Sequence, residues 1–228
     1  MAGPEVFLFG PEAPPFQEAV DYFLAKQIVP RHEFDAMAAE MRVKAFTAAH
    51  VFAADQLQAV YDACGQALQT GQTLADFRKA TEGIFARTWH RETVFRTNVL
   101  SAYGRGHWEQ AQATREARPY ARYSAVMDGR TRPRHAALHG LVFPLDHPFW
   151  KTYWPPWDYN CRCAAITLNA EQVEKEGLTV RRELPPDLPP PGKFVSPAAG
   201  EWQPDLSKYA DTLRNQLTHR LLEKSRIL

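Results

Sequence analysis

Apolar residues recur every three to four positions through the first half of the chain, which is the spacing of one helix face. The pattern runs over residues 16–28, 34–48 and 57–68. Pro30 follows the first run and Gly71 follows the third, and both residue types commonly mark the end of a helix. We therefore expect three successive helices in this part of the chain.

Two further helices are predicted before the pattern changes. Thr73 and Asp76 have the spacing of a capping box, so a fourth helix should begin here and continue to Phe85. From His90 to Arg115, apolar and small residues again share one face. Residues 16–118 are thus expected to form a helical array.

The pattern changes after Pro119. Tyr120–Met127 alternates between apolar and polar positions and is rich in aromatic residues, which favours a strand. Cys163–Leu168 predicts a second short strand and Leu178–Arg182 a third. We expect an α+β fold in which residues 119–182 add a small sheet and a long loop to the helices.

The long loop lies between the first two predicted strands, at residues 127–163. It shows neither helical nor strand periodicity, and it holds three of the six tryptophans and two of the three cysteines. Unstructured connections of this length inside a compact domain are usually functional. We expect an ordered loop whose own polar and aromatic groups hold it together.

The two ends of the chain have a different composition. Residues 1–15 contain four prolines and predict an extended arm. Residues 183–205 predict a proline-rich linker that cannot join the core, since seven prolines fall within 185–204. Residues 206–228 follow with a leucine stripe and predict a terminal helix, which must bury that stripe on its own domain or on a partner.

Charge is balanced overall but unevenly placed. With 27 Lys and Arg against 26 Asp and Glu, no global field draws the chain to nucleic acid or to a membrane. Residues 1–40 carry seven acids and two basic residues, whereas residues 115–134 carry six arginines and two acids. The first region could meet a basic partner and the second could meet phosphate, or both could be solvated faces with internal ion pairs.

Other features narrow the class of protein. Three cysteines do not make a disulfide framework, so a reducing compartment is expected. The first ten residues lack the pattern of a signal peptide. No apolar run reaches the roughly 18 residues that a membrane helix needs, so we expect no membrane partner.

Several loop residues are competent zinc ligands. His135, Cys161 and Cys163 are the first candidates, with Asp146 or His139 completing a set of four. The alternative is that the cysteines are small buried core residues and the histidines cap loop turns. Catalysis by a cysteine with His135 as base is not expected, because the order of nucleophile, base and orienting group is not recognisable.

The arginines of the loop allow two interpretations. Arg130, Arg132 and Arg134 alternate, so an extended chain would place all three on one face, where they could bind DNA phosphate. Alternatively they fasten the loop by binding carboxylates such as Asp128 and backbone carbonyls. Two other groups are predicted to be structural. The first group lies in the loop itself and consists of Trp150, Trp154 and Asn160. The second group lies in the preceding helix, where it is expected to support the loop, and consists of Glu92, Arg96 and Asn98.

Three motifs of the loop resemble one family. The strings DGRTRPRHAALHG, FPLDHPFW and YWPP with NCRC resemble the signature of the phage Mu F-like minor head proteins, or head morphogenesis proteins. Upstream, TGQTLADFRKA and RETVFRTNVLSAYGRGHW resemble two of the family's helices, and the resemblance covers roughly residues 14–168. Trp157–Asp158 departs from the pattern, since a small or glycine-containing pair is common there.

The resemblance implies a minor capsid protein of a tailed phage or prophage, needed for head morphogenesis. Its partners would be the portal protein and other capsid components, and packaged double-stranded DNA is a further candidate partner. It would lie in the capsid interior of the virion after assembly in the host cytoplasm, and it would not need to be an enzyme. Two other classes stay open from the residues: a metal- or thiol-dependent enzyme carried in the virion, and a zinc-stabilised DNA-binding module.

Overall fold

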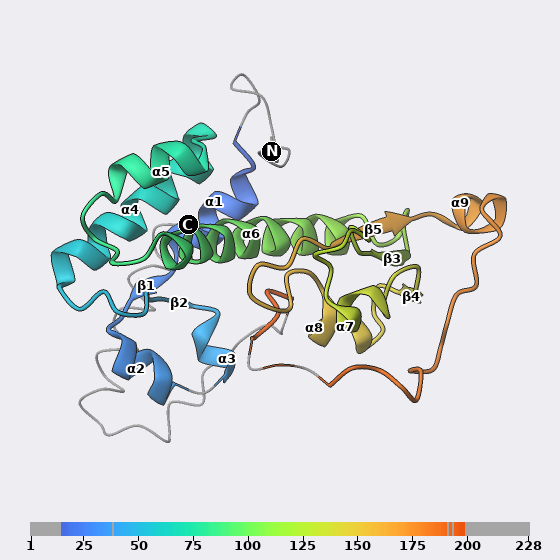
Figure 1. Cartoon of the computed structure of the whole chain (residues 1–228). Helices are drawn as coiled ribbons and strands as arrows, with labels where there is room; N and C mark the ends of the chain where they lie inside the picture. The colour runs from blue at the N-terminus through green and yellow to red at the C-terminus, as the bar shows by residue number, and fades with distance from the viewer. Residues whose placement is uncertain (1–14, 38, 191, 193, 199–228) are drawn as a thin grey trace, which may run out of the picture.

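A computed structural model describes residues 15–37, 39–190, 192 and 194–198 of the chain. The predicted arm, apart from Pro15, and the predicted terminal helix lie outside the described residues. The α+β prediction is confirmed: a helical region is followed by a small sheet (Figure 1). Within the described residues, no helix combines the length and the apolar composition needed to cross a membrane.

Four helices match the predicted array. They are α1 (Gln17–Leu24), α4 (Ala54–Thr70), α5 (Leu74–Ala80) and α6 (Thr88–Ala113). The third run ends as predicted at Gly71, which has a φ of 69°. Thr73 and Asp76 form the predicted capping box at the start of α5. The local signals therefore predicted the end of α4 and the start of α5, whereas α5 ends at Ala80, before the predicted Phe85.

The second predicted helix, over residues 34–48, is wrong in part. The chain forms two short helices and a strand there, namely α2 (Arg31–Ala36), α3 (Ala39–Arg42) and β2 (Ala45–Phe46). β2 pairs in parallel with β1 (Gln27–Ile28). Because β1 occupies residues predicted as helix, the first helix ends earlier than expected. The pairing inserts Phe46 into the core, where only 1% of it is exposed. Burial of that ring favours the strand over the helix.

The sheet has three antiparallel strands in the order β4-β3-β5. β3 (Tyr120–Ser124) and β5 (Ala164–Leu168) are the first two predicted strands, each shorter than expected. β4 (Val142–Pro144) arises inside the predicted loop. The third predicted strand forms only a single bridge, between Val180 and Val142. The loop also contains α7 (Pro133–Ala136) and α8 (Phe149–Tyr153), and α9 (Ala170–Lys175) follows β5.

The long helix α6 joins two cores (Figure 1). Its residues from Val94 to Ala102 join α1, α4 and α5 in what we call the helical core, which includes Phe23 and Val60. Near its other end, Ala111 belongs to a second, aromatic core with Trp150, Trp154 and Trp157, which lies against the sheet.

Two glycines of α6 allow close approach of its neighbours. A Cβ atom at Gly104 would lie 2.4 Å from the Pro155 carbonyl oxygen and 2.6 Å from Pro156 Cδ. A Cβ at Gly106 would lie 2.8 Å from the ring of Phe16, just before α1. The loop and α1 thus both contact α6 where it lacks side chains.

The proline-rich segment does not stay apart from the core as predicted. Residues 188–190, 192 and 194–198, here called the strap, return to the domain, and Ser196 and Ala198 are buried. Ser196 donates its hydroxyl hydrogen bond to the Trp154 carbonyl at 2.9 Å. The strap lacks regular structure, so its backbone carbonyls remain free to accept bonds from the domain.

Candidate metal centre

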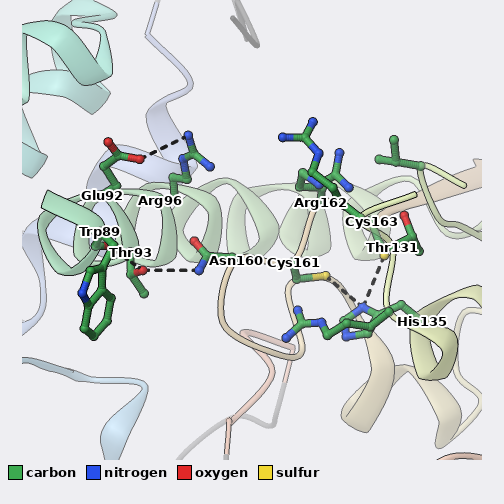
Figure 2. Close-up of a pocket in the computed structure, with 13 residues that line it drawn as sticks. Trp89, Glu92, Thr93, Arg96, Thr131, His135, Asn160, Cys161, Arg162 and Cys163 are labelled. Carbon is green, nitrogen blue, oxygen red and sulfur yellow. Dashed lines mark hydrogen bonds and ion pairs between the residues drawn. The ribbon is translucent and has the colours of Figure 1, made fainter. Parts of the chain in front are cut away.

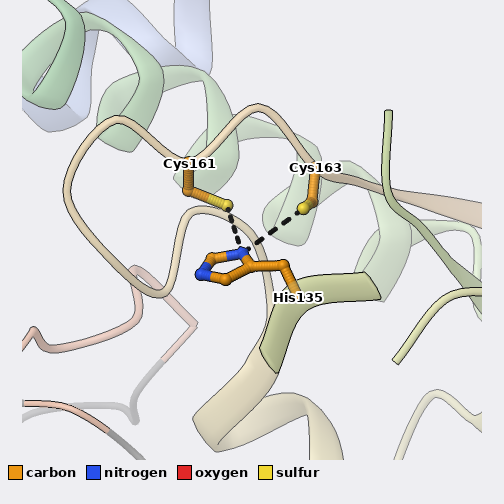
Figure 3. Close-up of side chains that lie close together, drawn as sticks. All are labelled: His135, Cys161 and Cys163. Carbon is orange, nitrogen blue, oxygen red and sulfur yellow. Dashed lines mark hydrogen bonds between the residues drawn. The ribbon is translucent and has the colours of Figure 1, made fainter. Parts of the chain in front are cut away.

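One histidine and two cysteines meet beside the sheet. His135 lies in α7, which begins at Pro133, a residue suited to the first position of a helix. Cys161 and Cys163 lie in the segment that leads into β5. Both sulfurs face the same ring nitrogen: His135 Nδ1 is 3.6 Å from Cys161 Sγ and 3.5 Å from Cys163 Sγ (Figure 3).

The spacing of these atoms suits a tetrahedral zinc ion. Zinc bonds of about 2.3 Å to sulfur and about 2.0 Å to nitrogen place the two ligand atoms about 3.5 Å apart at a tetrahedral angle. His135 and Cys161 are 2% and 3% exposed, whereas Cys163 is partly exposed. The group could therefore hold a metal with little rearrangement.

The two thiols differ in acidity. The hydrogen bond from Cys161, with another from Tyr123 and the charges of Arg132 and Arg162, lowers the pKa of Cys163 to about 7. The same contact with Cys163, together with burial, raises the pKa of Cys161. Cys163 therefore ionises before Cys161. A divalent cation would displace the Cys161 proton.

The pair Trp157–Asp158, which departs from the family pattern, lies against the His135 ring. The ring stacks on Trp157 with ring centroids 4.3 Å apart. Its Nε2 lies 3.7 Å from Asp158 Oδ2 and has no hydrogen-bond partner among the described residues. A carboxylate behind the ring is the usual companion of a metal-binding histidine. Sequence reasoning missed both roles, although the departure from the family pattern marked this pair.

The remaining two predicted ligands lie elsewhere. His139 Nδ1 accepts a hydrogen bond from the Ala125 amide at 3.1 Å. Asp146 is exposed in the turn after β4. Neither joins the cluster of three, so the prediction that one of them completes the ligand set is not supported by the described residues. The turn at Gly140 and the strand β4 direct this part of the loop away from the cysteines.

The alternating arginines do not share one extended face, because the chain turns into α7 at Arg132. Arg132 bonds the Tyr159 carbonyl at 2.7 Å and pairs with Asp158 at 2.9 Å. Arg134 lies over the Trp157 ring and donates to a strap carbonyl.

Arg130 remains the most open of the three, with 70% of its side chain exposed. Asp128 accepts two hydrogen bonds from Arg162, at 2.8 and 2.6 Å, and these hold the pKa of the Asp128 carboxyl well below its usual range. Most of the arginine contacts are therefore internal.

The other predicted structural residues have identifiable contacts. Trp150 donates to the Pro144 carbonyl at 3.0 Å, and Trp154 donates to the Gly104 carbonyl at 2.8 Å. Asn160 donates to the Thr93 hydroxyl at 3.3 Å and so ties the loop to α6 (Figure 2).

The predicted supporting residues of α6 do not all face the loop. Glu92 pairs with Arg78 and, at 3.8 Å, with Arg96. Glu92 and Arg96 line the cavity beside the metal ligands. Asn98 instead donates to the Val94 carbonyl of its own helix and lines a different cavity. The expectation that Asn98 supports the loop is therefore not supported.

The three candidate ligands line a cavity of about 350 Å³ between α6 and the loop (Figure 2). Trp89, Thr93 and Arg96 form its α6 side. A metal held by three protein ligands would direct a fourth position toward this space, where water or another ligand could bind.

Comparison with known proteins places the chain among phage proteins. Residues 58–166 match the family model described as Phage Mu protein F like protein. The chain is 32% identical over 189 residues to the putative capsid assembly protein F of Escherichia phage Mu, across 73% of this chain and 43% of that protein. It is 31% identical over 156 residues to the Mu-like prophage FluMu F protein of Haemophilus influenzae, across 60% of this chain and 38% of that protein.

The chain thus spans less than half the length of these curated relatives. The search of solved structures gives no match. The matched segment begins in α4 and ends in β5, so it includes α6, most of the aromatic core and all three candidate ligands. By these matches, the chain belongs to the family of Phage Mu protein F like proteins.

Proposed function

We propose that this chain acts in head morphogenesis as a minor capsid protein of a tailed phage or prophage. The observation that supports this most is the name of the phage Mu relative, a capsid assembly protein, combined with a match that includes the whole frame from α4 to β5. In this proposal the chain associates with the portal inside the head and contacts other capsid components. That role needs no catalysis.

The portal contact has a direct test. The full chain would be co-expressed with the portal protein of the same phage, and complexes would be isolated through a tag on the portal. A stoichiometric complex that survives gel filtration is the expected result. A prophage lacking this chain should then yield defective heads, restored by the chain in trans. Normal, DNA-filled heads without it would contradict the proposal.

Contact with packaged DNA is a finer part of the same proposal. Arg130 offers an open cation, whereas Arg132 and Arg134 are held by Asp158 and by carbonyls. One exposed phosphate contact would add little affinity and would give binding a weak salt dependence. The test compares the affinity of the parent chain and of Arg130→Ala for duplex DNA. Equal affinities would show that Arg130 is not a phosphate contact.

We further propose that His135 Nδ1, Cys161 and Cys163 bind zinc. The support is the pair of nitrogen–sulfur distances, the burial of the ligands and the carboxylate of Asp158 behind the ring. When bound, the ion would supply folding free energy by linking α7 to the approach of β5. Elemental analysis should find one zinc per chain, and Cys161→Ser should abolish it.

A second candidate function rests on the cavity beside these ligands. Three protein ligands and a fourth position open to a cavity are typical of catalytic zinc, where the metal lowers the pKa of a bound water. If the chain is a metal-dependent hydrolase, the zinc-loaded parent chain should turn over a phosphodiester or ester substrate. Cys161→Ser should abolish that turnover. Zinc content without any such activity favours the structural role.

A further inference from the structure

A second cavity lies at the start of α6, on the side of the helical region. Its volume is about 310 Å³, within the size range of small-molecule sites. Its walls come from five parts of the chain: the end of α1 with Lys26, the segment 31–50, the first half of α6, Tyr159 of the loop, and the strap. It shares Trp89 and Thr93 with the cavity of the candidate metal centre.

The lining of this cavity is basic. Lys26, Arg31, Arg42, His50 and His90 contribute to it, whereas no Asp or Glu occurs among its described lining residues. Asp35, outside the lining, neutralises Arg31 through an ion pair of 2.8 Å. At neutral pH the excess positive charge therefore comes from Lys26 and Arg42.

Lys26 is the most informative of these groups, because it is only 6% exposed. Its ammonium lies over the Tyr22 ring, 4.9 Å from the centroid. Burial lowers the pKa of Lys26 to about 8, so the group is still mostly charged at neutral pH. A charge in a poorly hydrated wall attracts an anion more strongly than an exposed lysine would.

One lining histidine, His90, senses the same positive field. Burial lowers the pKa of His90, and the nearby His50 and Arg31 lower it further. The positive groups of the cavity therefore act on one another across it. An anion bound among them would relieve that repulsion.

Two threonine hydroxyls add polar groups without partners. Thr47 Oγ1, after β2, and Thr97 Oγ1, in α6, are buried atoms with no hydrogen-bond partner among the described residues. Both residues line the cavity. Buried hydroxyls are normally hydrogen-bonded, so these two point to a ligand that accepts or donates here.

The rim of the cavity is aromatic. Trp89 is 63% exposed and Tyr159 is 49% exposed, although large aromatic side chains normally gain by burial. The Tyr159 ring meets Phe194 of the strap edge to face, with centroids 5.2 Å apart. Flat, exposed rings beside a basic cavity are the combination that binds nucleotides, with the base on a ring and the phosphate on the cations.

We propose that this second cavity binds one nucleotide, with its phosphate near Lys26 and Arg42 and its base against Trp89 or Tyr159. The nucleotide can be free, or it can be one unit of a single DNA strand. The site is separate from the metal ligands, and the proposal does not depend on portal association.

The test is calorimetric titration of the full chain with deoxyadenosine monophosphate, a five-residue deoxyadenosine strand, inorganic phosphate and a penta-glutamate peptide. We expect saturable binding of the monophosphate at one site per chain. Equal affinities for the monophosphate and the strand would assign the site to free nucleotides, whereas tighter binding of the strand would assign it to a DNA strand.

Three variants locate the site. Lys26→Met keeps the length of the buried stem and should weaken nucleotide binding about tenfold, the effect of a lost charge-assisted hydrogen bond. Trp89→Ala should weaken it at least about fivefold through lost stacking. Thr97→Val removes a buried hydroxyl at nearly constant volume and should weaken it by a smaller factor. Because Trp89 is largely exposed, its variant should fold even where Lys26→Met does not.

Two control variants complete the design. Lys79→Met removes an exposed lysine of α5, and Arg130→Ala removes a cation that lines only the first cavity. Neither should change nucleotide affinity. The proposal is overturned if the folded chain binds no nucleotide, if inorganic phosphate binds as tightly as the monophosphate and Trp89→Ala has no effect, or if only the acidic peptide binds in a Lys26-dependent manner.

Discussion

The helical core and the aromatic core bury apolar surface with different side chains. In the helical core, aliphatic, small and phenylalanine side chains repeat mostly at helical spacing, and most backbone hydrogen bonds are made within the helices. In the aromatic core, the backbone is mostly irregular, and bulky rings with polar atoms fill the space.

Three rings of the aromatic core therefore also bind a distant segment through a hydrogen bond. Trp154 reaches the Gly104 carbonyl of α6, Tyr153 reaches the Pro189 carbonyl of the strap, and Trp157 donates to the Tyr123 hydroxyl of β3. Buried N–H and O–H groups need such partners, and they allow few alternatives. The helical core should tolerate change, whereas the aromatic core should not.

The largest expected effect separates the cysteines of the two cores. Cys161→Ser should cost more than about 5 kcal/mol in saturating zinc, because it removes the metal's contribution to folding. Cys64→Ser, fully buried in the helical core, should cost about 1–3 kcal/mol for an unpaired hydroxyl. The measurement is denaturant unfolding with zinc and again with chelator.

Chelator should lower the melting temperature of the parent chain and should abolish the excess cost of Cys161→Ser. Equal costs for both serine variants, and no metal in the purified chain, would show that Cys161 and Cys163 are only buried core thiols.

Glycine-to-alanine changes compare the two cores without any metal. At Gly104 the new methyl group would meet the Pro155 carbonyl at 2.4 Å, and backbone cannot move aside. At Gly65 of α4 it would meet Leu24 Cδ2 at 3.3 Å, and that partly exposed side chain can move. We expect Gly104→Ala to cost about 3 kcal/mol, as overpacking does. Gly65→Ala should be neutral or slightly stabilising, since alanine favours helix.

Chemical denaturation of both glycine variants would measure this difference. Similar unfolding free energies for the two would mean that the loop can retreat from α6, and the contrast in tolerance between the cores would be lost.

The same contrast explains what the sequence could predict. Helices α4, α5 and α6 follow from local periodicity and from signals such as Gly71 and the Thr73 capping box. The parallel pair β1–β2 and the strand β4 are two and three residues long, too short for any periodicity. Their existence depends on partners distant in the chain, which a local pattern does not contain.

The candidate ligands were predictable only in part. The chemistry of His135, Cys161 and Cys163 marked them, even though 26 residues separate the histidine from the first cysteine. Asp146 has equally suitable chemistry, but the path of the loop takes it away. The role of Asp158 depends on the position of the His135 ring. Residue type identifies competent groups, whereas the backbone path selects among them.

Truncation tests how far the strap belongs to the aromatic core. A chain ending at Arg182 would lose the strap's bonds to Tyr153, Arg134, Arg105 and Trp154. At about 1 kcal/mol for each net hydrogen bond, we expect a loss of about 2–4 kcal/mol. The sequence alone predicted no loss.

A chain ending at Ala198 is the matched control for the strap, because it keeps these four bonds and separates their contribution from that of residues 199–228. If that longer chain folds normally but heads assemble poorly, residues 199–228 contribute a docking element. An unchanged melting temperature for the chain ending at Arg182 would mean that the strap adds no stability.

The smallest effect concerns the arginines of the loop. Arg132→Ala should cost about 1 kcal/mol, because its ion pair with Asp158 and its bond to the Tyr159 carbonyl are partly exposed to solvent. Arg130→Ala should leave stability unchanged, since its side chain is 70% exposed and its nearest carboxylate is 3.7 Å away. For duplex DNA we expect the opposite order, so that Arg130→Ala weakens binding more than Arg132→Ala does. The slope of log affinity against log salt concentration should fall by about one for Arg130→Ala. A stable Arg132→Ala variant that loses DNA binding would instead make Arg132 a phosphate contact, and the internal bonds of the loop would then be dispensable for its fold.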